Sequence, residues 1–520
     1  MLNMEEEQKN TIKDNFLMEN LPGASDMLSF ALPNTDLLYY PFNSKQNNKP
    51  MDVFDLTYQK KAGESEEFVS VDKTTTQNKQ KKNQKYQNQK HNQKRGNQAN
   101  KNYIPVSLQR FNINQSIQPD STWILIKDFN KITLEKLNID NMKIKVTNKA
   151  IYGNIYQINE SLENEVSPYN PKPLKTDKNM KFYGNTNTPF DQELLTLDDS
   201  VNIYITDKIL AVIMTSICNG HPWHLKIKKL GDKIFIEKMD NEIDMVTVNE
   251  SDNTSTIYDD SNINSYKNLN IEATLINEFI KEQILDIREE TKLENTKPNP
   301  FKDEEEDDKN VEHLGYVYRL WTLEGMKILV RSQVHAYAPV DIDEKSEKEE
   351  DEEKEEEEEE GEEKEEKEEK LGYEFIDVFA LNEFDKNTYL NKDSNLGASI
   401  IKRELKNNYL KMAKWGVLSY LGGVKKLKIA FVTRKKTNDN SAHVISTIYD
   451  LGTDNLLLLT NFSRSIAWGI FKEIITIIQN YKEDGSFILM KTFGETSAKS
   501  LLKIFKVPDS YFKNLEPDNE

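Results

Sequence analysis

The sequence predicts an α+β domain in which mixed, largely antiparallel sheets are flanked by helices. Two stretches carry this prediction. Residues 225–238 form two runs of strand-forming residues that meet at Gly231-Asp232, the pattern of a hairpin. Residues 271–285 repeat apolar side chains every three or four positions, which is typical of an amphipathic helix. Strand-like and helix-like stretches continue almost to the C-terminus.

The composition bounds the class of protein. The chain has 520 residues, enough for one large domain or two ordinary ones. Its single cysteine, Cys218, rules out an intramolecular disulfide framework and suits a reducing compartment. No apolar run is long enough to span a membrane, and the first ten residues lack the features of a signal peptide. We therefore expect a soluble, cytoplasmic protein.

Residues 1–120 are predicted to form a disordered tail, because their apolar residues are sparse and show no sustained period. Within this tail, residues 37–61 contain an aromatic island that could dock into a groove of a partner. Its leading candidates are Tyr39, Tyr40 and Phe42. A loosely attached tail is the alternative interpretation.

A basic segment follows the island. Residues 73–119 contain ten lysines and arginines and neither Asp nor Glu. Such a segment attracts a phosphate backbone without reading its sequence. It could equally be a solvated linker.

The folded domain is expected to cover residues 121–512, beginning with a strand at 123–126. A further strand at 201–205 leads into an apolar helix at 208–217. Thr206-Asp207 fits the start of that helix, since a short side-chain oxygen can accept from an unpaired amide.

After the hairpin, residues 245–248 are predicted to continue a strand. Residues 249–268 form a long polar loop, and loops of this length usually move or act. In the helix predicted at 271–285, the polar residues fall at positions i, i+3, i+4 and i+7 and are expected to form one exposed face. These residues are Thr274, Asn277, Glu278 and Lys281.

Two strands joined at Glu324-Gly325 are predicted next, with Arg319 on the first. An acidic run at 341–370 then interrupts the domain. Between Asp343 and Glu369 it holds 20 acidic residues against five lysines, a net charge of −15 out of −19 for the chain. Such a run stays disordered, so we interpret it as an insertion whose ends pair across a sheet.

Residues 400–434 are predicted to form strand, helix and strand, with Gly422-Gly423 ending the helix. On a strand at 400–406, Glu404 and Lys406 would share one face. In nucleases an acid and a lysine spaced in this way hold a metal and approach the attacked phosphate. A solvated strand face gives the same pattern.

The C-terminal part is predicted to contain a helix at 466–480, closing strands at 487–492 and 499–505, and a tail at 513–520. Trp415 and Trp468 are expected in the core. The sequence has no P-loop and no zinc-spaced set of Cys and His.

Several stretches resemble the d-type subunits of eukaryotic translation initiation factor 3, in that family's order. They include I-T-D-K-I-L-A, P-W-H-L-K-I-K-K-L-G-D-K-I-F-I-E-K, I-E-A-T-L-I-N, E-L-K-N-N-Y-L-K-M-A-K-W and F-V-T-R. The resemblance covers residues 201–512, with a fainter match at 39–61. The folded domain of that family is in turn similar to the decapping exoribonucleases.

This resemblance implies an initiation factor subunit that binds messenger RNA and its 7-methylguanosine cap in the pre-initiation complex. The implied partners are the other subunits, the small ribosomal subunit and the messenger RNA, with no cofactor. The implied cap-contacting residues are Asp207, Gly220, His221, Thr274, Asn277 and Glu278. Three of them depart from the family: Gly220-His221 replaces Val-Tyr, and Glu278 replaces His.

The likeness to the nucleases implies a degenerate metal site. Arg319 and Phe375 stand where the nucleases have acids, whereas Asp377, Glu404 and Lys406 are retained. The loss of two oxygen ligands indicates that the chain holds no metal and is not an enzyme. Two alternatives remain open: a metal-dependent 5'-end decapping nuclease, and a purely structural subunit with a vestigial cap pocket.

Overall fold

The computed structural model describes most of the chain from residue 116 to residue 513. The described ranges are 116–177, 180–183, 191–218, 222–239, 242–248, 262–302, 311–340, 372–383, 389–390, 396–492 and 500–513. The docking island, the basic segment up to residue 115, the acidic insertion and residues 514–520 lie outside them. So do most of the polar loop, Gly220 and His221.

The larger of two sheets has nine strands and includes strands from near both ends of the described chain. In spatial order they are β1 (Ile124–Asn130), β14 (Ser500–Val507), β13 (Gly485–Lys491), β5 (Trp223–Leu230), β6 (Lys233–Lys238), β4 (Ile203–Thr206), β8 (Met326–Val334), β7 (Gly315–Leu323) and β2 (Ile144–Gly153). Only the pairs that β4 makes with β6 and β8 are parallel among the described strands of this sheet.

The smaller sheet has five strands. In spatial order they are β3 (Lys172–Pro173), β12 (Asp439–Gly452), β11 (Lys426–Lys436), β10 (Tyr373–Glu383) and β9 (Ala336–Pro339). Its one parallel pair among the described residues is β10 with β11. Tyr373 lies opposite Pro339, so the two ends of the acidic insertion are neighbouring strands, as predicted.

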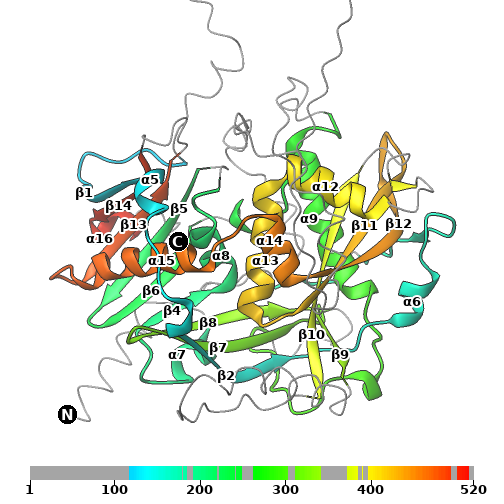
Figure 1. The fold of residues 1–520 in the computed structure, drawn as a ribbon, viewed down its shortest axis with the longest axis horizontal. Coiled ribbons are helices and arrows are strands. Elements are labelled where there is room, and N and C mark those ends of the chain that lie inside the picture. Colours follow the sequence, from blue (N-terminus) through cyan, green and yellow to red (C-terminus); the bar gives the residue numbers. More distant parts are fainter. Residues whose placement is uncertain are drawn as a thin grey trace, which may run out of the picture.

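Helices lie against and between the sheets (Figure 1). They are α5 (Lys131–Leu134), α6 (Glu160–Glu165), α7 (Gln192–Thr196), α8 (Asp207–Met214), α9 (Tyr266–Gln283), α12 (Leu396–Asn407), α13 (Tyr409–Gly422), α14 (Thr453–Leu459), α15 (Arg464–Gln479) and α16 (Asp509–Lys513). Short 3-10 turns occupy Asn141–Lys143, Glu242–Asp244 and Glu289–Thr291. The predicted class of mixed, largely antiparallel sheets flanked by helices is therefore confirmed.

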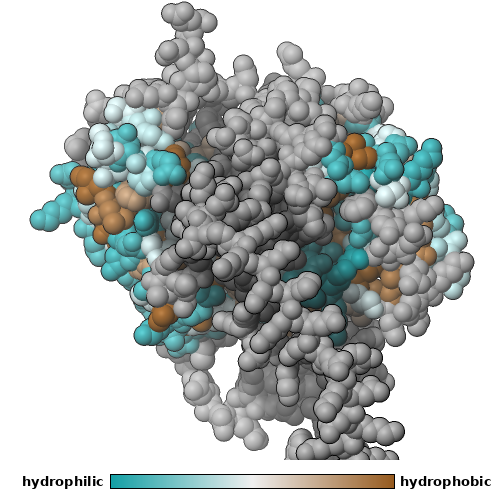
Figure 2. Space-filling view, turned by 90° about the horizontal axis from the view of Figure 1, so that it is seen from above, coloured by the Kyte–Doolittle hydropathy of each residue, from teal (hydrophilic) through white to brown (hydrophobic). Residues whose placement is uncertain are grey.

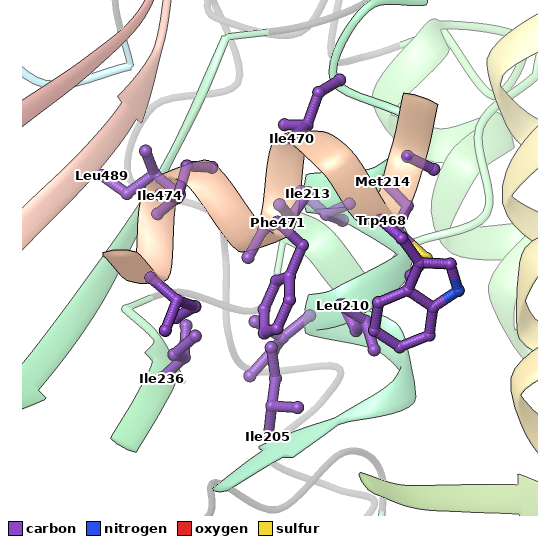
Figure 3. Packing of buried hydrophobic residues seen from close by; sticks show 14 of the residues in the cluster. Ile205, Leu210, Ile213, Met214, Ile236, Trp468, Ile470, Phe471, Ile474 and Leu489 are labelled. Atoms are coloured by element: carbon purple, nitrogen blue, oxygen red, sulfur yellow. The ribbon is translucent and has the colours of Figure 1, made fainter. Parts of the chain in front are cut away.

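The largest core cluster forms where α15 and α8 cover one face of the nine-stranded sheet. Figure 3 shows Trp468 and Phe471 of α15 beside Leu210 of α8, with Phe471 reaching toward Ile205 of β4. All four side chains are fully buried. The core position predicted for Trp468 is thus confirmed. On the face seen in Figure 2, the described surface consists of hydrophilic areas with separate hydrophobic patches.

The strand predicted at 400–406 is wrong, because these residues belong to helix α12. Ile400 and Ile401 are neighbours in sequence and both are buried, as is Leu396. A strand would place adjacent side chains on opposite faces, whereas the 396, 400 and 401 spacing fits one side of a helix. Glu404 is buried and Lys406 is exposed, so they do not share a face.

The strand predicted at 245–248 is also wrong. The backbone N–H groups of Val246 and Val248 donate to side chains of α9, namely Thr274 Oγ1 at 3.0 Å and Asn270 Oδ1 at 2.9 Å. These bonds replace the ladder that a strand would form. Helix α9 begins at Tyr266, earlier than predicted, with Ser265 as its N-cap.

Candidate functional site

A cavity of about 130 Å³ lies between α8, α9 and α13 and the segment 243–248. It adjoins several of the residues that the sequence indicated. Rings, lysines, acids and amides all contribute to its wall. The lining includes Lys208, Trp223, Asp244, Asn270, Asn277, Glu278, Lys281, Phe379, Lys411, Lys414 and Trp415.

Asp207 fixes the start of α8. Its Oδ1 accepts from the Lys208 backbone N–H at 2.6 Å, and its Oδ2 accepts from the Gln333 N–H on β8 at 2.8 Å. Burial raises the pKa of Asp207 to about 6, although these amide bonds oppose the rise. Asp207 therefore holds the helix against the sheet, and it is its neighbour Lys208 that lines the cavity.

Thr274 and Asn277 are buried, so the exposed face predicted for α9 is wrong. Thr274 Oγ1 donates to the Asn270 carbonyl at 2.8 Å and accepts from Val246. The Asn277 amide makes a two-way contact with Ala380 of β10, donating to its carbonyl at 2.9 Å and accepting from its N–H at 2.8 Å. The polar stripe of α9 thus binds protein on both sides, and Asn277 also reaches the cavity wall.

Glu278 and Lys281 form an ion pair at 2.9 Å in the cavity wall. Burial alone would raise the pKa of Glu278, but Lys281 and Lys208 lower it below its usual range. Glu278 therefore stays ionised and paired. Its charge is compensated inside the protein, which weakens the repulsion of phosphates that a free carboxylate would cause.

Aromatic rings line one part of the cavity. Trp223 at the start of β5 is half-buried there, two residues after His221. Phe379 of β10 and Trp415 of α13 are stacked, with ring centroids 4.6 Å apart and planes 11° apart. Trp415 is buried, as predicted, and in addition it faces the cavity. Sequence patterns did not single out Trp223, although its position beside His221 could have drawn attention to it.

Four lysines of α8, α9 and α13 surround the same space: Lys208, Lys281, Lys411 and Lys414. Lys411 lies 3.1 Å from Glu404, and Lys414 donates to the Ile243 carbonyl at 2.9 Å. This convergence could not be predicted from the sequence, because the lysines are up to 206 residues apart and meet only through the packing of α13 on α8.

Two buried polar atoms, on residues that border the cavity, lack hydrogen-bond partners within the described structure. Asn270 is fully buried, and its Oδ1 accepts from Val248 while its Nδ2 has no partner. Asp244 pairs with Lys238 through Oδ2, whereas its Oδ1 has no hydrogen-bond partner. Burial alone would raise the pKa of Asp244, but Lys238 and Lys208 lower it, so the carboxylate is ionised.

Arg319, which stands where the nucleases have an acid, binds the end of a helix. Its guanidinium donates to the Leu421 carbonyl of α13 at 3.0 Å and to Asn148 Oδ1 at 3.0 Å, and it lies over the Trp321 ring. A cation at a helix C-terminus is favourable, because the last carbonyls carry partial negative charge. These contacts give Arg319 a structural role.

The other positions of the degenerate nuclease set are dispersed. Phe375 is buried in an apolar cluster, and Asp377 accepts from Ser419 at 2.7 Å in the interior. Glu404 bonds Asn408 and pairs with Lys411, while Lys406 is on the exposed side of the same helix. Among the described residues, no group of three or more acidic, His or Cys side chains is arranged to hold a metal ion.

The fold and the cavity define an α+β protein with a ring-lined pocket of mixed charge, suited to a ligand that has both a flat ring and anionic groups. The chain belongs to the family of eukaryotic translation initiation factor 3 subunit 7, whose model matches residues 40–506. The family resemblance stated from the sequence is therefore confirmed. Membership makes the chain a subunit of a multisubunit initiation factor.

Named relatives agree with this assignment. The D-1 subunit of translation initiation factor 3 from Drosophila pseudoobscura pseudoobscura is 30% identical over 412 residues, which are 78% of this chain and 67% of the fly protein. The corresponding subunit from Bombyx mori is 30% identical over 408 residues, covering 77% of this chain and 67% of the silkworm protein. The Nasonia vitripennis protein is 28% identical over 422 residues, with coverages of 80% and 68%.

Similar solved structures include two described as Rai1. The Scheffersomyces stipitis protein, in complex with (3'-NADP)+ and calcium ion, is 9% identical with a TM-score of 0.41, covering 77% of this chain and 96% of that one. The Candida albicans protein, in complex with pU5-Mn2+, is 10% identical with a TM-score of 0.42, at coverages of 76% and 96%. No described helix is long and apolar enough to cross a membrane.

Proposed function

We propose that this initiation factor subunit binds messenger RNA through its 7-methylguanosine cap, in the cavity between α8, α9 and α13. The observation that carries the proposal is the convergence of rings and lysines on one space. Trp223 and the Phe379–Trp415 pair supply aromatic surface, and four lysines supply positive charge. A methylated guanine has a flat, positively charged ring followed by three phosphates, so it needs both kinds of group.

Trp223 is the proposed stacking surface. It is half-buried at the cavity wall, whereas Trp415 is committed to its stack with Phe379. A cationic ring over an indole gains from the ring quadrupole, and stacking of a base on a ring contributes on the order of 1–3 kcal/mol. This assigns the stacking role to Trp223, two residues after His221, which the family resemblance implied as a cap contact.

Lys414 and Lys411 are proposed to meet the bridging phosphates. Both project from α13 into the cavity wall, and their protein partners include a carbonyl and a carboxylate. A lysine ammonium has three protons to donate, so it can bind a phosphate oxygen and a protein acceptor together. The basic segment at 73–119 would then hold the RNA that follows the cap, without reading its sequence.

The proposed role is binding without catalysis. Glu404 is engaged by Lys411 on a helix, and Lys406 faces solvent away from it. Glu404 and Lys406 therefore cannot lie together beside one phosphate. Incubation of the purified chain with manganese and short capped RNA should release no cap.

Crosslinking of capped RNA tests the proposal. Capped RNA should crosslink to the wild-type chain, and free 7-methylguanosine triphosphate should compete better than the unmethylated triphosphate. Trp223→Leu keeps apolar bulk but removes the ring, so it should lower the crosslink roughly tenfold. Tyr169→Leu, at an exposed position, is the matched control.

Equal crosslinking of capped and uncapped RNA, with no effect of Trp223→Leu, would refute the proposed cap site.

The partner contacts call for a separate test. We propose that the island at 37–61 docks onto a neighbouring subunit and that the complex acts on the small ribosomal subunit in the cytoplasm. Removal of residues 1–70 should then weaken co-purification with the other subunits while the truncated chain still folds.

A further inference from the structure

The backbone of Trp223 is supported by a neighbouring strand on one side. Trp223 is the first residue of β5, and the residue directly opposite it on β13 is Lys491. On the other side of β5, the pairing with β6 begins only at Leu225, which lies opposite Lys238. Among the described strands, β13 is therefore the one that holds Trp223 in place, and it does so at Lys491.

Lys491 also holds the chain that leads to Trp223. It is only 1% exposed, and its Nζ donates to the Cys218 carbonyl at 2.9 Å. A buried ammonium needs such a bond, because burial removes the water that would solvate it. Cys218 comes shortly after α8 and five residues before Trp223, and its N–H donates to the Thr215 carbonyl at 2.9 Å. One buried lysine thus joins the chain after α8 to the start of β5.

The side chains of Trp223 and Lys491 begin next to each other. Directly opposite residues of an antiparallel pair point to the same face of the sheet, with Cβ atoms about 4.5–5.5 Å apart. Trp223 packs against the core cluster that includes Leu210 of α8, so this is the face that α8 covers. The stem of Lys491 starts beside the tryptophan and ends at Cys218.

We infer that Lys491 is a positioning residue of the proposed cap site. By tying Cys218 to the strand position opposite Trp223, it fixes the orientation in which the indole meets the methylated guanine. The attraction between a cationic ring and an indole requires the cation to lie over the indole face, so a ring that turns away loses it. This inference rests on the proposed cap site and adds the residue that sets its preference for the methylated base.

Position and charge make opposite predictions for Lys491. The ring of 7-methylguanine is positively charged, and like charges repel. A lysine that acted only through its charge would therefore disfavour the methylated base, and its removal would raise the preference for methylation. A lysine that acts by holding Trp223 has the reverse effect, because its removal releases the ring and lowers that preference.

The first test measures this preference. Binding of 7-methylguanosine triphosphate and of GTP to the full chain is followed by quenching of tryptophan fluorescence. Wild-type protein should bind the methylated nucleotide about tenfold more tightly, the gain expected for a cation on an indole face. Lys491→Met keeps the length of the side chain but donates no hydrogen bond, so it should bring the ratio close to one. Lys491→Arg can still donate to Cys218 and should keep most of the preference.

The second test asks whether Lys491 acts through the ring. Trp223→Leu alone should weaken binding of 7-methylguanosine triphosphate roughly tenfold. If Lys491 acts through Trp223, adding Lys491→Met to Trp223→Leu should weaken binding by less than about twofold more, because the effects of coupled residues are not additive. A general disturbance of the fold would instead multiply the two losses.

Lys229→Met is the matched control. Lys229 is another buried lysine of the β5–β13 pair, at its opposite end, where it lies opposite Gly485 and pairs with Asp484 at 3.3 Å. Its replacement should leave the nucleotide ratio unchanged. Thermal melting checks that each variant folds. If Lys491→Met does not fold, Lys491→Gln takes its place, since its amide is one atom shorter than the lysine and does not reach Cys218.

The outcomes separate this inference from the cap site. If wild type prefers 7-methylguanosine triphosphate and the Met or Gln variant keeps or raises that preference, the inference is wrong and the cap site stands. The same holds if the losses in the double variant multiply. If wild type binds both nucleotides equally, or neither, the cap site is wrong and the inference falls with it.

Discussion

Glu312 is a buried carboxyl group close to other acids. Only 6% of the residue is exposed, and its Oε1 accepts from the Tyr183 backbone N–H at 2.8 Å. Burial raises the pKa of Glu312 to about 8, and the nearby Glu278 carboxylate adds to the rise, while Lys281 opposes it. The folded protein therefore takes up a proton here at a pH where the unfolded chain does not.

The stability of the protein should consequently depend on pH through this residue. Because the pKa is higher in the folded state, stability is fully present below the unfolded value of about 4.5 and is lost as pH rises to about 8. The loss is at most about 1.4 kcal/mol per pH unit for one proton. Glu312→Gln keeps the acceptor for Tyr183 and should flatten this slope.

Urea denaturation at pH 5, 6.5 and 8 measures the effect. The free energy of unfolding of Glu312→Gln should exceed that of wild type by a margin that grows with pH. Glu294→Gln, at an exposed carboxyl, is the control and should follow the wild-type slope. A slope that is the same for all three proteins would show that Glu312 is ionised in the folded state.

Single residues also mark the limit of what the sequence predicts about the site. Helical spacing is visible in the sequence, so it located α9 and the Asn277–Glu278 pair that lines the cavity. It could not show that Lys208 and Lys414 converge on the same cavity. Their proximity results from the packing of α13 on α8, which residue types and their spacing do not reveal.

At the scale of elements, the end of α13 depends on two residues that are far apart in sequence. Gly423 adopts a left-handed backbone, with φ of 76°, that ends the helix as predicted. A Cβ atom at this position would lie 2.8 Å from the Arg319 guanidinium, which itself bonds the last carbonyls. The C-terminal end of α13 therefore packs closely against Arg319 of β7.

Gly423→Ala should destabilise the protein more than an equivalent change elsewhere. Gly231→Ala is the matched control, since Gly231 is also left-handed, with φ of 60°, but its Cβ would meet no atom within 4 Å. Backbone strain should cost each variant about 1–2 kcal/mol. Crowding of Arg319 should cost Gly423→Ala a further 1–3 kcal/mol or so. Equal melting temperatures for the two variants would contradict this account.

Element type was predictable where the side-chain period was unambiguous, as in the β5–β6 hairpin and helices α13 and α15. It failed for α12, because the run of β-branched residues at Ile400 and Ile401 favours a strand locally. Packing decided otherwise, since the adjacent residues Ile400 and Ile401 are both buried and can share one side only in a helix. The segment at 245–248 failed for a different reason: its hydrogen-bond partners are side chains that no strand rule anticipates.

On the scale of the whole molecule, the acidic insertion joins two strands, β9 and β10, whose pairing does not depend on it. Strands β9 and β10 flank the insertion and pair directly with each other, from Pro339 opposite Tyr373 to Ala336 opposite Ile376. Closing a longer or shorter loop between them changes the entropy only with the logarithm of its length. The insertion carries most of the net charge of the chain and no apolar residue between positions 343 and 369.

Deletion of residues 344–369 should leave the melting temperature within a few degrees of wild type, because stability changes below about 1 kcal/mol move the midpoint little in a domain of this size. Differential scanning calorimetry of the shortened and full-length chains checks this expectation. Loss of the cooperative transition on deletion would mean that the acidic run is packed against the domain.

The pairing of β1 with β14 has a consequence for synthesis of the protein. Ile124 lies opposite Lys506, so the first and last strands of the domain are neighbours in one sheet. A ribosome that adds roughly 5–20 residues per second needs on the order of 20–75 s to make the chain between them. For that time β1 has no strand to pair with, because its neighbour in the described sheet is β14. The nascent chain should therefore depend on chaperones, and prematurely terminated chains should be targets of quality control.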